Sequence, residues 1–380
     1  MHTLMFLERT TSATHQNKFF SMMVRLVLIV ALSASFADAF APTAFVSPSR
    51  LQTASSFASQ SSALFAIGVL ARKAKEADIR KYCEDGVDDV VMEQYKKIKA
   101  ARDDPLDLTK EPGPLQSELT RRKGTITIIA EYKRKIENGG FINEMFDPEI
   151  LSPTFREFGA SAIAVMADER MGGCTYSDVA AFVEEQRRAR NDIPGSVMVI
   201  NNDLIVDEVQ IARTAAVGAK AVVIISSVVG EEKVESFLKA AQAVGIEAIV
   251  AVSNKDEAQK AVNLGARIIE VVNVEGADAK YDCVDGLEIP DGRLVTTIAS
   301  IAARNDKGLD EIEEAWHCRD KGFNAVWVSD ALYKSGMDSS EHPGAIIKSM
   351  KAKSSLKFAS PKARSGKGEG AREYLGDILM

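Results

Sequence analysis

Residues 126–135 read Ile-Thr-Ile-Ile-Ala-Glu-Tyr-Lys-Arg-Lys, an apolar run rich in β-branched residues that ends in a group of charged ones. Such a run predicts a buried strand whose C-terminal end emerges at a site. Because side chains alternate between the faces of a strand, Glu131 and Lys133 share one face. Tyr132 and Arg134 share the other. Taken alone, the acid and the cation also fit a solvated ion pair at the rim of a sheet.

Apolar segments alternate with amphipathic ones from residue 124 to about residue 350. We predict strands over residues 126–130, 161–166, 197–200, 221–225, 248–252, 267–272, 294–298 and 325–328. Glycines that suit left-handed helix C-caps precede five of them, at Gly159, Gly218, Gly245, Gly265 and Gly322. Apolar strands separated by helices pair in parallel, and eight such units close most readily into an α/β fold of the (β/α)8 TIM barrel type. A doubly wound open sheet is the alternative, although no Gly-x-Gly-x-x-Gly motif follows the first strand.

Residues 1–65 have the pattern of a bipartite targeting sequence. Residues 22–39 contain an apolar run and end in Ala-Asp-Ala, as secretory signals do. Residues 40–75 begin with Phe-Ala-Pro and contain no acidic residue, which is typical of transit peptides. This arrangement resembles the plastid presequences of algae with secondary red plastids. We therefore expect a mature protein that starts near Ala66, resides in the plastid stroma and has no membrane span; ordinary secretion is the alternative.

Two further segments flank the predicted barrel. Residues 66–123 carry a helical pattern as far as about Asp107, followed by the helix breakers Pro112-Gly113-Pro114, and we predict an N-terminal helical extension. Residues 351–380 form a basic tail with no acidic residue before Glu369, which predicts a flexible segment. Such a tail can tether the protein to a partner protein, and a disordered solubilising tail is the alternative.

The composition argues against several classes of function. A net charge of -7 and a pI near 5.4 do not suit nucleic-acid binding, which requires a basic surface. The four cysteines are far apart and form no Cys-x-x-Cys pair, so we interpret them as reduced thiols. Two of the four histidines, His2 and His15, lie in the predicted presequence, which disfavours a histidine metal site or triad. We expect neither a metal nor an organic cofactor.

Several of these segments resemble those of one enzyme family. Residues 129–134, Ile-Ala-Glu-Tyr-Lys-Arg, are similar to the first-strand motif of indole-3-glycerol phosphate synthases, the barrel enzymes of tryptophan biosynthesis. Residues 158–165, Phe-Gly-Ala-Ser-Ala-Ile-Ala-Val, resemble the second strand of that family, and residues 203–206 with 210–211 resemble the third unit. The similarity extends over about residues 66–350. The family decarboxylates, cyclises and dehydrates a phosphorylated carboxyphenylamino-deoxyribulose without a cofactor.

The resemblance implies roles for five residues. Glu131 and Lys133 match catalytic positions, with Lys133 facing the carboxylate of the substrate and Glu131 setting the charge of the site. Asn202, Asp203 and Ser300 would bind this phosphorylated, anionic substrate.

The chain also departs from the family. Asn202 stands where the family has a lysine, and Ala251 and Ala299 stand where it has glutamates. Ile301 replaces a glycine of the phosphate site, and Ser329-Asp330 places a carboxylate where a phosphate would bind. A positioned acid or base contributes roughly 10²- to 10⁴-fold to a rate. We therefore interpret the chain as a pseudoenzyme or a member with altered activity, and an active synthase that uses the five residues named above is the alternative.

Overall fold

The computed structural model describes residues 53–108, 111–120, 125–136, 140–141, 147–302, 309–334 and 343–351. The predicted presequence before Thr53 and the predicted tail after Lys351 lie outside these residues. Targeting, the start of the mature protein and tethering by the tail therefore stay predictions. Within the described residues, no helix is long and apolar enough to cross a membrane.

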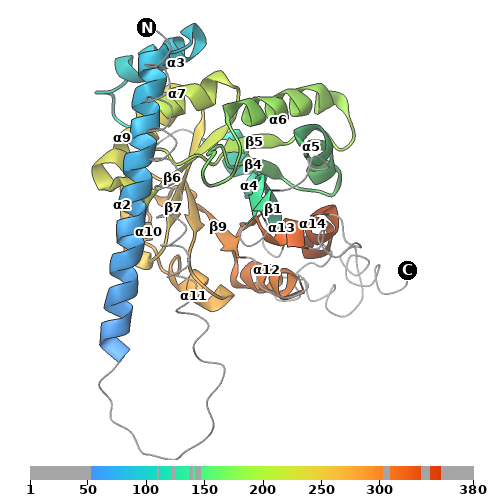
Figure 1. Ribbon diagram of the computed structural model, residues 1–380. Helices are drawn as coiled ribbons and strands as arrows, with labels where there is room; N and C mark the ends of the chain where they lie inside the picture. The colour runs from blue at the N-terminus through green and yellow to red at the C-terminus, as the bar shows by residue number, and fades with distance from the viewer. Residues whose placement is uncertain are drawn as a thin grey trace, which may run out of the picture. The chain divides into compact units, whose positions relative to one another are not determined.

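Eight parallel strands form a closed barrel in the order β1-β10-β9-β8-β7-β6-β5-β4 (Figure 1). The barrel strands are β1 (Thr127–Tyr132), β4 (Ala162–Val165), β5 (Met198–Asn201), β6 (Ala221–Ile225), β7 (Glu247–Val252), β8 (Ile268–Val271), β9 (Thr296–Ile301) and β10 (Ala325–Val328). A separate two-stranded sheet pairs β2 (Lys135–Ile136) with β3 (Gly140–Phe141). On β1, Ile129 is in register with Trp327 of β10 and with Ala162 of β4, which closes the ring. The predicted (β/α)8 barrel is confirmed.

Helices lie around the outside of the barrel strands (Figure 1). The helices of the described residues are α2 (Thr53–Asp85), α3 (Asp89–Ala100), α4 (Pro114–Leu119), α5 (Pro148–Glu157), α6 (Tyr176–Arg188), α7 (Glu208–Ala216), α8 (Ser226–Val229), α9 (Glu231–Ala243), α10 (Lys255–Asn263), α11 (Ala277–Asp282), α12 (Leu309–Lys321), α13 (Ala331–Lys334) and α14 (Pro343–Lys351), with 3-10 turns η2 (Ala189–Asn191) and η3 (Pro290–Gly292). All five glycines predicted as C-caps have positive φ angles. Gly218, for example, has a φ of 88° and follows Val217, the C-cap of α7, at a position where a side chain would be strained.

Seven of the predicted strands agree with the structure to within two residues, and β9 is the exception. Residues 294–298 were predicted, whereas β9 runs from Thr296 to Ile301. Leu294 is 44% exposed and precedes the strand. Ser300, in contrast, is a strand residue in register with Trp327 of β10. The apolar character of Leu294 favoured it as a strand residue, but hydrogen bonding with β10 determines where β9 ends.

The helical extension contributes directly to the barrel. Proline 114, which we predicted to break a helix, is the first residue of α4, a position where its missing N–H costs nothing. Leu115 and Leu119 of α4 are fully buried among the side chains that fill the barrel interior. The carboxylate of Glu247 accepts hydrogen bonds from the first amides of α4, at 2.6 Å from Leu115 N. Helix α4 therefore closes the N-terminal end of the barrel.

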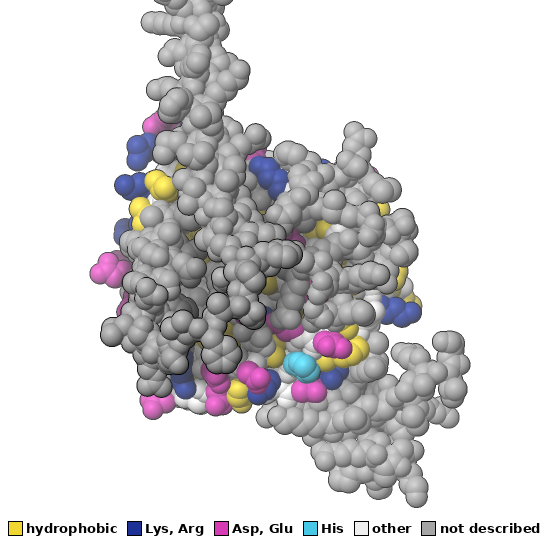
Figure 2. Space-filling model, turned by 60° about the horizontal axis from the view of Figure 1, so that its bottom comes forward, with side chains coloured by type: hydrophobic (Ala, Val, Ile, Leu, Met, Phe, Trp, Pro, Cys, Tyr) yellow, Lys and Arg dark blue, Asp and Glu magenta, His cyan; other side chains and the backbone are white. Residues whose placement is uncertain are grey.

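The surface charges are interspersed in the face drawn in Figure 2, where acidic and basic side chains neighbour each other among the residues that are coloured. On the helices, Lys260 pairs with Glu231 at 2.7 Å, and Lys321 pairs with Asp278. Opposite charges at such distances largely cancel at the surface. The prediction that the protein does not bind nucleic acid stays a prediction.

Candidate active site at the C-terminal mouth of the barrel

Polar side chains on or just after four strands point into the barrel at its C-terminal end, where barrel enzymes carry their sites. Each stands two residues beyond an apolar residue of the interior: Glu131 beyond Ile129, Asn202 beyond Ile200, Glu270 beyond Ile268, and Ser300 beyond Ile298. Three of these four, Glu131, Asn202 and Ser300, were predicted as site residues, and the structure brings them together. Glu270 was not predicted.

Two carboxyl groups share this interior. Glu131 is only 2% exposed, and its Oε1 accepts a hydrogen bond of 2.6 Å from the Asn202 amide. Glu270 is 4% exposed and hydrogen-bonds to the side chain of Ser300. Burial, and secondarily the charge of Glu131, raises the pKa of Glu270 to about 8, against the opposing effect of Ser300. Glu270 is therefore mostly protonated at neutral pH.

Lys133 lies at the same end of the barrel, and its ammonium forms an ion pair with Asp330, just after β10. The side chains of both residues are 11% exposed. Asp330 was expected to repel a bound phosphate, but its carboxylate is instead directed at Lys133. The cation that the resemblance assigns to the carboxylate of the substrate is thus already neutralised by the chain itself.

The two alanines that stand for glutamates of the family have different surroundings. Ala251 faces the barrel interior, in register with Glu270 of the neighbouring strand. Ala299 is buried on the outer side of the sheet, among residues that pack against the helices. A carboxyl group, that of Glu270 on β8, therefore does stand next to Ala251, and the comparison of single sequence positions did not reveal it. Position 299 does not face the interior at all.

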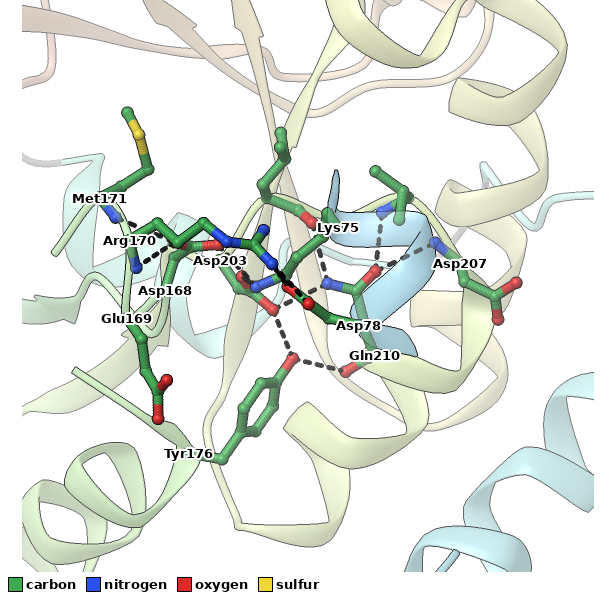
Figure 3. Close-up of polar contacts among 12 residues, drawn as sticks. Lys75, Asp78, Asp168, Glu169, Arg170, Met171, Tyr176, Asp203, Asp207 and Gln210 are labelled. Carbon is green, nitrogen blue, oxygen red and sulfur yellow. Dashed lines mark hydrogen bonds and ion pairs between the residues drawn. The ribbon is translucent and has the colours of Figure 1, made fainter. Parts of the chain in front are cut away.

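Asp203 belongs to a different cluster, which ties helix α2 to the barrel (Figure 3). The Lys75 ammonium of α2 bonds to Asp168 after β4, at 2.8 Å, and to Asp203 after β5. Asp203 also accepts hydrogen bonds from the Tyr176 hydroxyl, at 3.1 Å, and from the Gln210 amide, at 2.7 Å. Asp203 was predicted to bind substrate, but the structure places it in this network and apart from the interior cluster.

The charges of this second cluster attract one another, although at Asp203 burial outweighs the attraction of Lys75 and raises the pKa of the carboxyl group. Lys75 is only 7% exposed. Burial alone would lower the pKa of Lys75, but Asp203 and Asp168 outweigh burial and raise it. Burial likewise opposes ionisation of Asp168, yet its hydrogen bond to Lys75 lowers the pKa of that carboxyl overall. Nearby, Arg72 of α2 donates to the carbonyl of Val228 at 3.3 Å, so α2 contacts the segments that follow β4, β5 and β6.

A small cavity of about 200 Å³ lies between α8, α9 and α10. Ser226, Glu231, Glu257 and Lys260 are among the residues that line it. The ammonium of Lys260 pairs with Glu231 at 2.7 Å, and Glu257 accepts hydrogen bonds from Ser226 and from Ser253. The charged groups that line this cavity thus pair with each other or with serines, and we place the candidate site at the barrel mouth, where the inward-facing polar side chains gather.

The family model of indole-3-glycerol phosphate synthase matches residues 80–341, which is more than half of the chain. The chain belongs to the indole-3-glycerol phosphate synthase family. The resemblance of its strand motifs to this family is thereby confirmed. The family match extends from the last turns of α2 to the segment before α14, and so includes all the barrel strands.

Curated relatives bear the name indole-3-glycerol phosphate synthase. The relative from Leptospira interrogans is 35% identical over 147 residues, which are 39% of this chain and 55% of that protein. The relative from Opitutus terrae is 27% identical over 243 residues, or 64% of this chain and 86% of that protein. The relative from Petrotoga mobilis is 25% identical over 219 residues, or 56% of this chain and 81% of that protein.

Lys75, Asp168 and Glu270 are charged residues of these clusters that were not predicted as site residues. Lys75 stands in a helical segment with charges on several sides, where nothing singles it out. Glu270 interrupts the otherwise apolar run of residues 268–272, Ile-Ile-Glu-Val-Val, and its spacing of two from Ile268 would have placed it inside the barrel. An acidic residue in the middle of a buried parallel strand is such a signal.

Proposed function

We propose that this protein is a plastid member of the indole-3-glycerol phosphate synthase family that does not catalyse the decarboxylating ring closure of the family, and whose barrel is non-catalytic or altered in activity. The ion pair between Lys133 and Asp330 carries the proposal. An anionic substrate would have to displace Asp330 from Lys133 before its own carboxylate could bind. Opposite unit charges about 4 Å apart attract by roughly 4 kcal/mol near a protein surface, so this displacement is costly.

Neighbouring positions support the same conclusion. Asn202 donates to Glu131, and an amide cannot transfer a proton as an ammonium can. Ala251 offers no titratable group to the interior. The carboxylates of Glu131 and Asp330 also disfavour a second anion, such as a phosphate, at this end of the barrel.

A turnover assay tests the proposal. The protein from Ala66 onward, mixed with the carboxyphenylamino-deoxyribulose phosphate substrate of the family, should produce indole fluorescence at the rate of a blank. The variant Lys133→Ala should give the same rate. The Opitutus terrae relative, assayed in parallel, controls for the quality of the substrate. Rapid turnover that Lys133→Ala abolishes would establish the alternative, an active synthase that uses Glu131, Lys133, Asn202, Asp203 and Ser300.

The plastid location rests on the signal pattern of residues 22–39 and on the acid-free segment that follows it. A fluorescent protein fused behind residues 1–75 should accumulate in the plastid stroma of a diatom-type host. The matched control carries residues 1–39 only, and it should stop in the secretory pathway because it lacks the second signal. Secretion of the longer fusion would contradict the plastid location.

A further inference from the structure

Helix α2 is held at the rim of the barrel mouth by charged side chains. The Lys75 ammonium bonds to Asp168 after β4 and to Asp203 after β5, as Figure 3 shows. In the same view, Arg170 of the segment after β4 pairs in return with Asp78 of α2. The attachment is therefore reciprocal, because the helix and the segment each supply a cation and a carboxylate.

Apolar packing contributes little to this attachment. Among residues 68–85, the part of α2 whose side chains the structure describes, Ile79 is the one buried aliphatic side chain, and Leu70 is 65% exposed. The next helix, α3, in contrast places Val91 and Ile98 in the main core. Segments with few buried apolar contacts open at a lower free energy than the whole protein unfolds. The position of α2 thus depends on the ion pairs of Lys75.

The segment after β4 is a compact turn. The Asp168 carboxylate bonds to Lys75, and it also accepts hydrogen bonds from the backbone amides two and three residues further on, at 2.8 and 2.9 Å. The turn folds back so closely that a side chain at Gly172 would collide with the carbonyl oxygen of Met166. A turn packed this closely shifts as a unit, so a displacement of Asp168 also displaces Gly172.

This turn leads from α2 to the backbone beside Lys133. The carbonyl oxygen of Gly172 accepts hydrogen bonds from the amides of Arg134 and Lys135, at 2.7 and 3.0 Å. Lys133 directly precedes these two residues, and its ammonium is the one that pairs with Asp330. A continuous series of contacts therefore connects α2 with the cation of the barrel mouth.

A second connection runs through the end of β5. Asp203 bonds to Lys75, and Asn202, the residue before it, donates its side-chain amide to Glu131 at 2.6 Å. The backbone amide of Asn202 donates to the carbonyl of Val165, the last residue of β4, at 2.9 Å. One ammonium thus holds the two segments whose neighbours, Asn202 and the end of β1, carry polar contacts of the mouth.

We propose that Lys75, with Asp168 and Asp203, forms a latch that keeps the barrel mouth closed. With its ion pairs formed, α2 holds the segments after β4 and β5 in the positions in which Asp330 occupies Lys133. With them broken, α2 leaves the rim, the backbone beside Lys133 loosens, and the Lys133 ammonium becomes accessible to solvent and to small anions. A buried carboxylate without its cation is unfavourable, so the two ion pairs break together and the latch has two states.

The inference goes beyond the proposed function and rests on it only in taking Asp330 as the group that occupies Lys133. It adds a conformational control of the mouth, by a helix that precedes the barrel.

Acetylation of Lys133 in the full-length protein tests the latch. An N-hydroxysuccinimide ester of acetic acid modifies accessible amines, and peptide mass spectrometry measures the rate at Lys133. The rate should be low in the unaltered protein, where this side chain is buried. Lys75→Met should raise it at least about 100-fold, because two buried carboxylates lose their cation and favour the released state. Lys75→Arg keeps the positive charge and should stay much closer to the unaltered protein.

The matched control is Lys97→Met, which removes an exposed lysine of α3 and should leave the rate at Lys133 unchanged. Amide exchange in D2O separates release of α2 from unfolding of the barrel. The amides of Arg134 and Lys135 should have protection factors at least about 10-fold below those of Ile249 and Val250 in β7, in the unaltered protein as well as in Lys75→Met.

Two outcomes would overturn the proposal. In the first, Lys133 is acetylated no faster in Lys75→Met than in Lys97→Met, so Lys75 does not control the mouth. In the second, the amides beside Lys133 are as strongly protected as those of β7, so Lys133 is reached only when the whole barrel unfolds. Neither measurement involves turnover, so a failure here is distinguishable from a failure of the synthase assay.

Discussion

Replacing Lys75 with methionine should lower the free energy of unfolding by about 3–5 kcal/mol at pH 7. Methionine fills a similar volume but removes the ammonium that pairs with both Asp168 and Asp203. Two buried carboxylates would then face each other without a cation, and each would lose the attraction that offsets its desolvation. Urea unfolding monitored by fluorescence and by circular dichroism measures the change.

Two controls separate charge pairing from other effects of the substitution. Lys97→Met removes an exposed lysine that pairs with Glu93 at 3.3 Å, and it should change the stability by less than about 0.5 kcal/mol. Adding Asp203→Asn to Lys75→Met should restore part of the loss, because one of the two unpaired charges is then gone. If Lys75→Met lowers the free energy of unfolding no more than Lys97→Met does, the ion pairs of Lys75 with Asp168 and Asp203 do not stabilise the fold as we infer.

The barrel could be predicted from sequence because its signals are repeated. Every strand is an apolar run, glycines mark five helix ends, and the period of two assigns the faces of β1. Glu131 and Lys133 were expected to share one face of β1, and both lie at the C-terminal mouth of the barrel, where Glu131 accepts a hydrogen bond from Asn202 and Lys133 pairs with Asp330. Tyr132, on the other face, packs against Phe182 of α6 with ring centroids 4.7 Å apart.

The partners of the site residues could not be predicted in the same way, because they come from distant parts of the chain. Asp203 and Lys75 are 128 positions apart by their numbers, and no local pattern connects them. The same holds for Lys133 and Asp330, whose pairing depends on β1 and β10 being neighbours in the closed barrel. Sequence comparison also treated position 299 as a site position, whereas the pleat of β9 directs Ser300 inward and Ala299 outward.

These pairings explain how a barrel can keep its fold while its mouth changes. The apolar layer around Ile129, Ile249 and Trp327 fills the interior independently of the polar groups above it. At the mouth, Asp330 satisfies Lys133, and Asn202 satisfies Glu131. A buried charge with a partner costs much less than one without, so substitutions that would disable a synthase need not destabilise the protein when the remaining charges are paired.

The protonation of Glu270 should make the protein less stable as the pH rises from about 4.5 to about 8. The folded-state pKa is about 8 against an ordinary value of 4.5, so between these values the unfolded chain releases the proton and the folded protein keeps it. The unfolded state then binds fewer protons, and the free energy of unfolding falls with pH. Below about 4.5 the group is protonated in both states, and above about 8 it is ionised in both. The full loss is on the order of 5 kcal/mol.

The Glu270→Gln variant has no ionisable group at position 270, so it should not show this fall in the free energy of unfolding with pH. Its free energy of unfolding should be close to that of the unaltered protein at pH 4.5 and exceed it increasingly up to about pH 8, beyond which the difference should stay constant. Urea unfolding at pH 5, 7 and 9 measures both proteins under identical conditions. Glu93→Gln, at a partly exposed carboxylate on α3, is the control and should follow the unaltered protein throughout. Parallel curves for Glu270→Gln and the unaltered protein would mean that Glu270 ionises as easily in the folded protein as in the unfolded chain, and that burial does not raise its pKa.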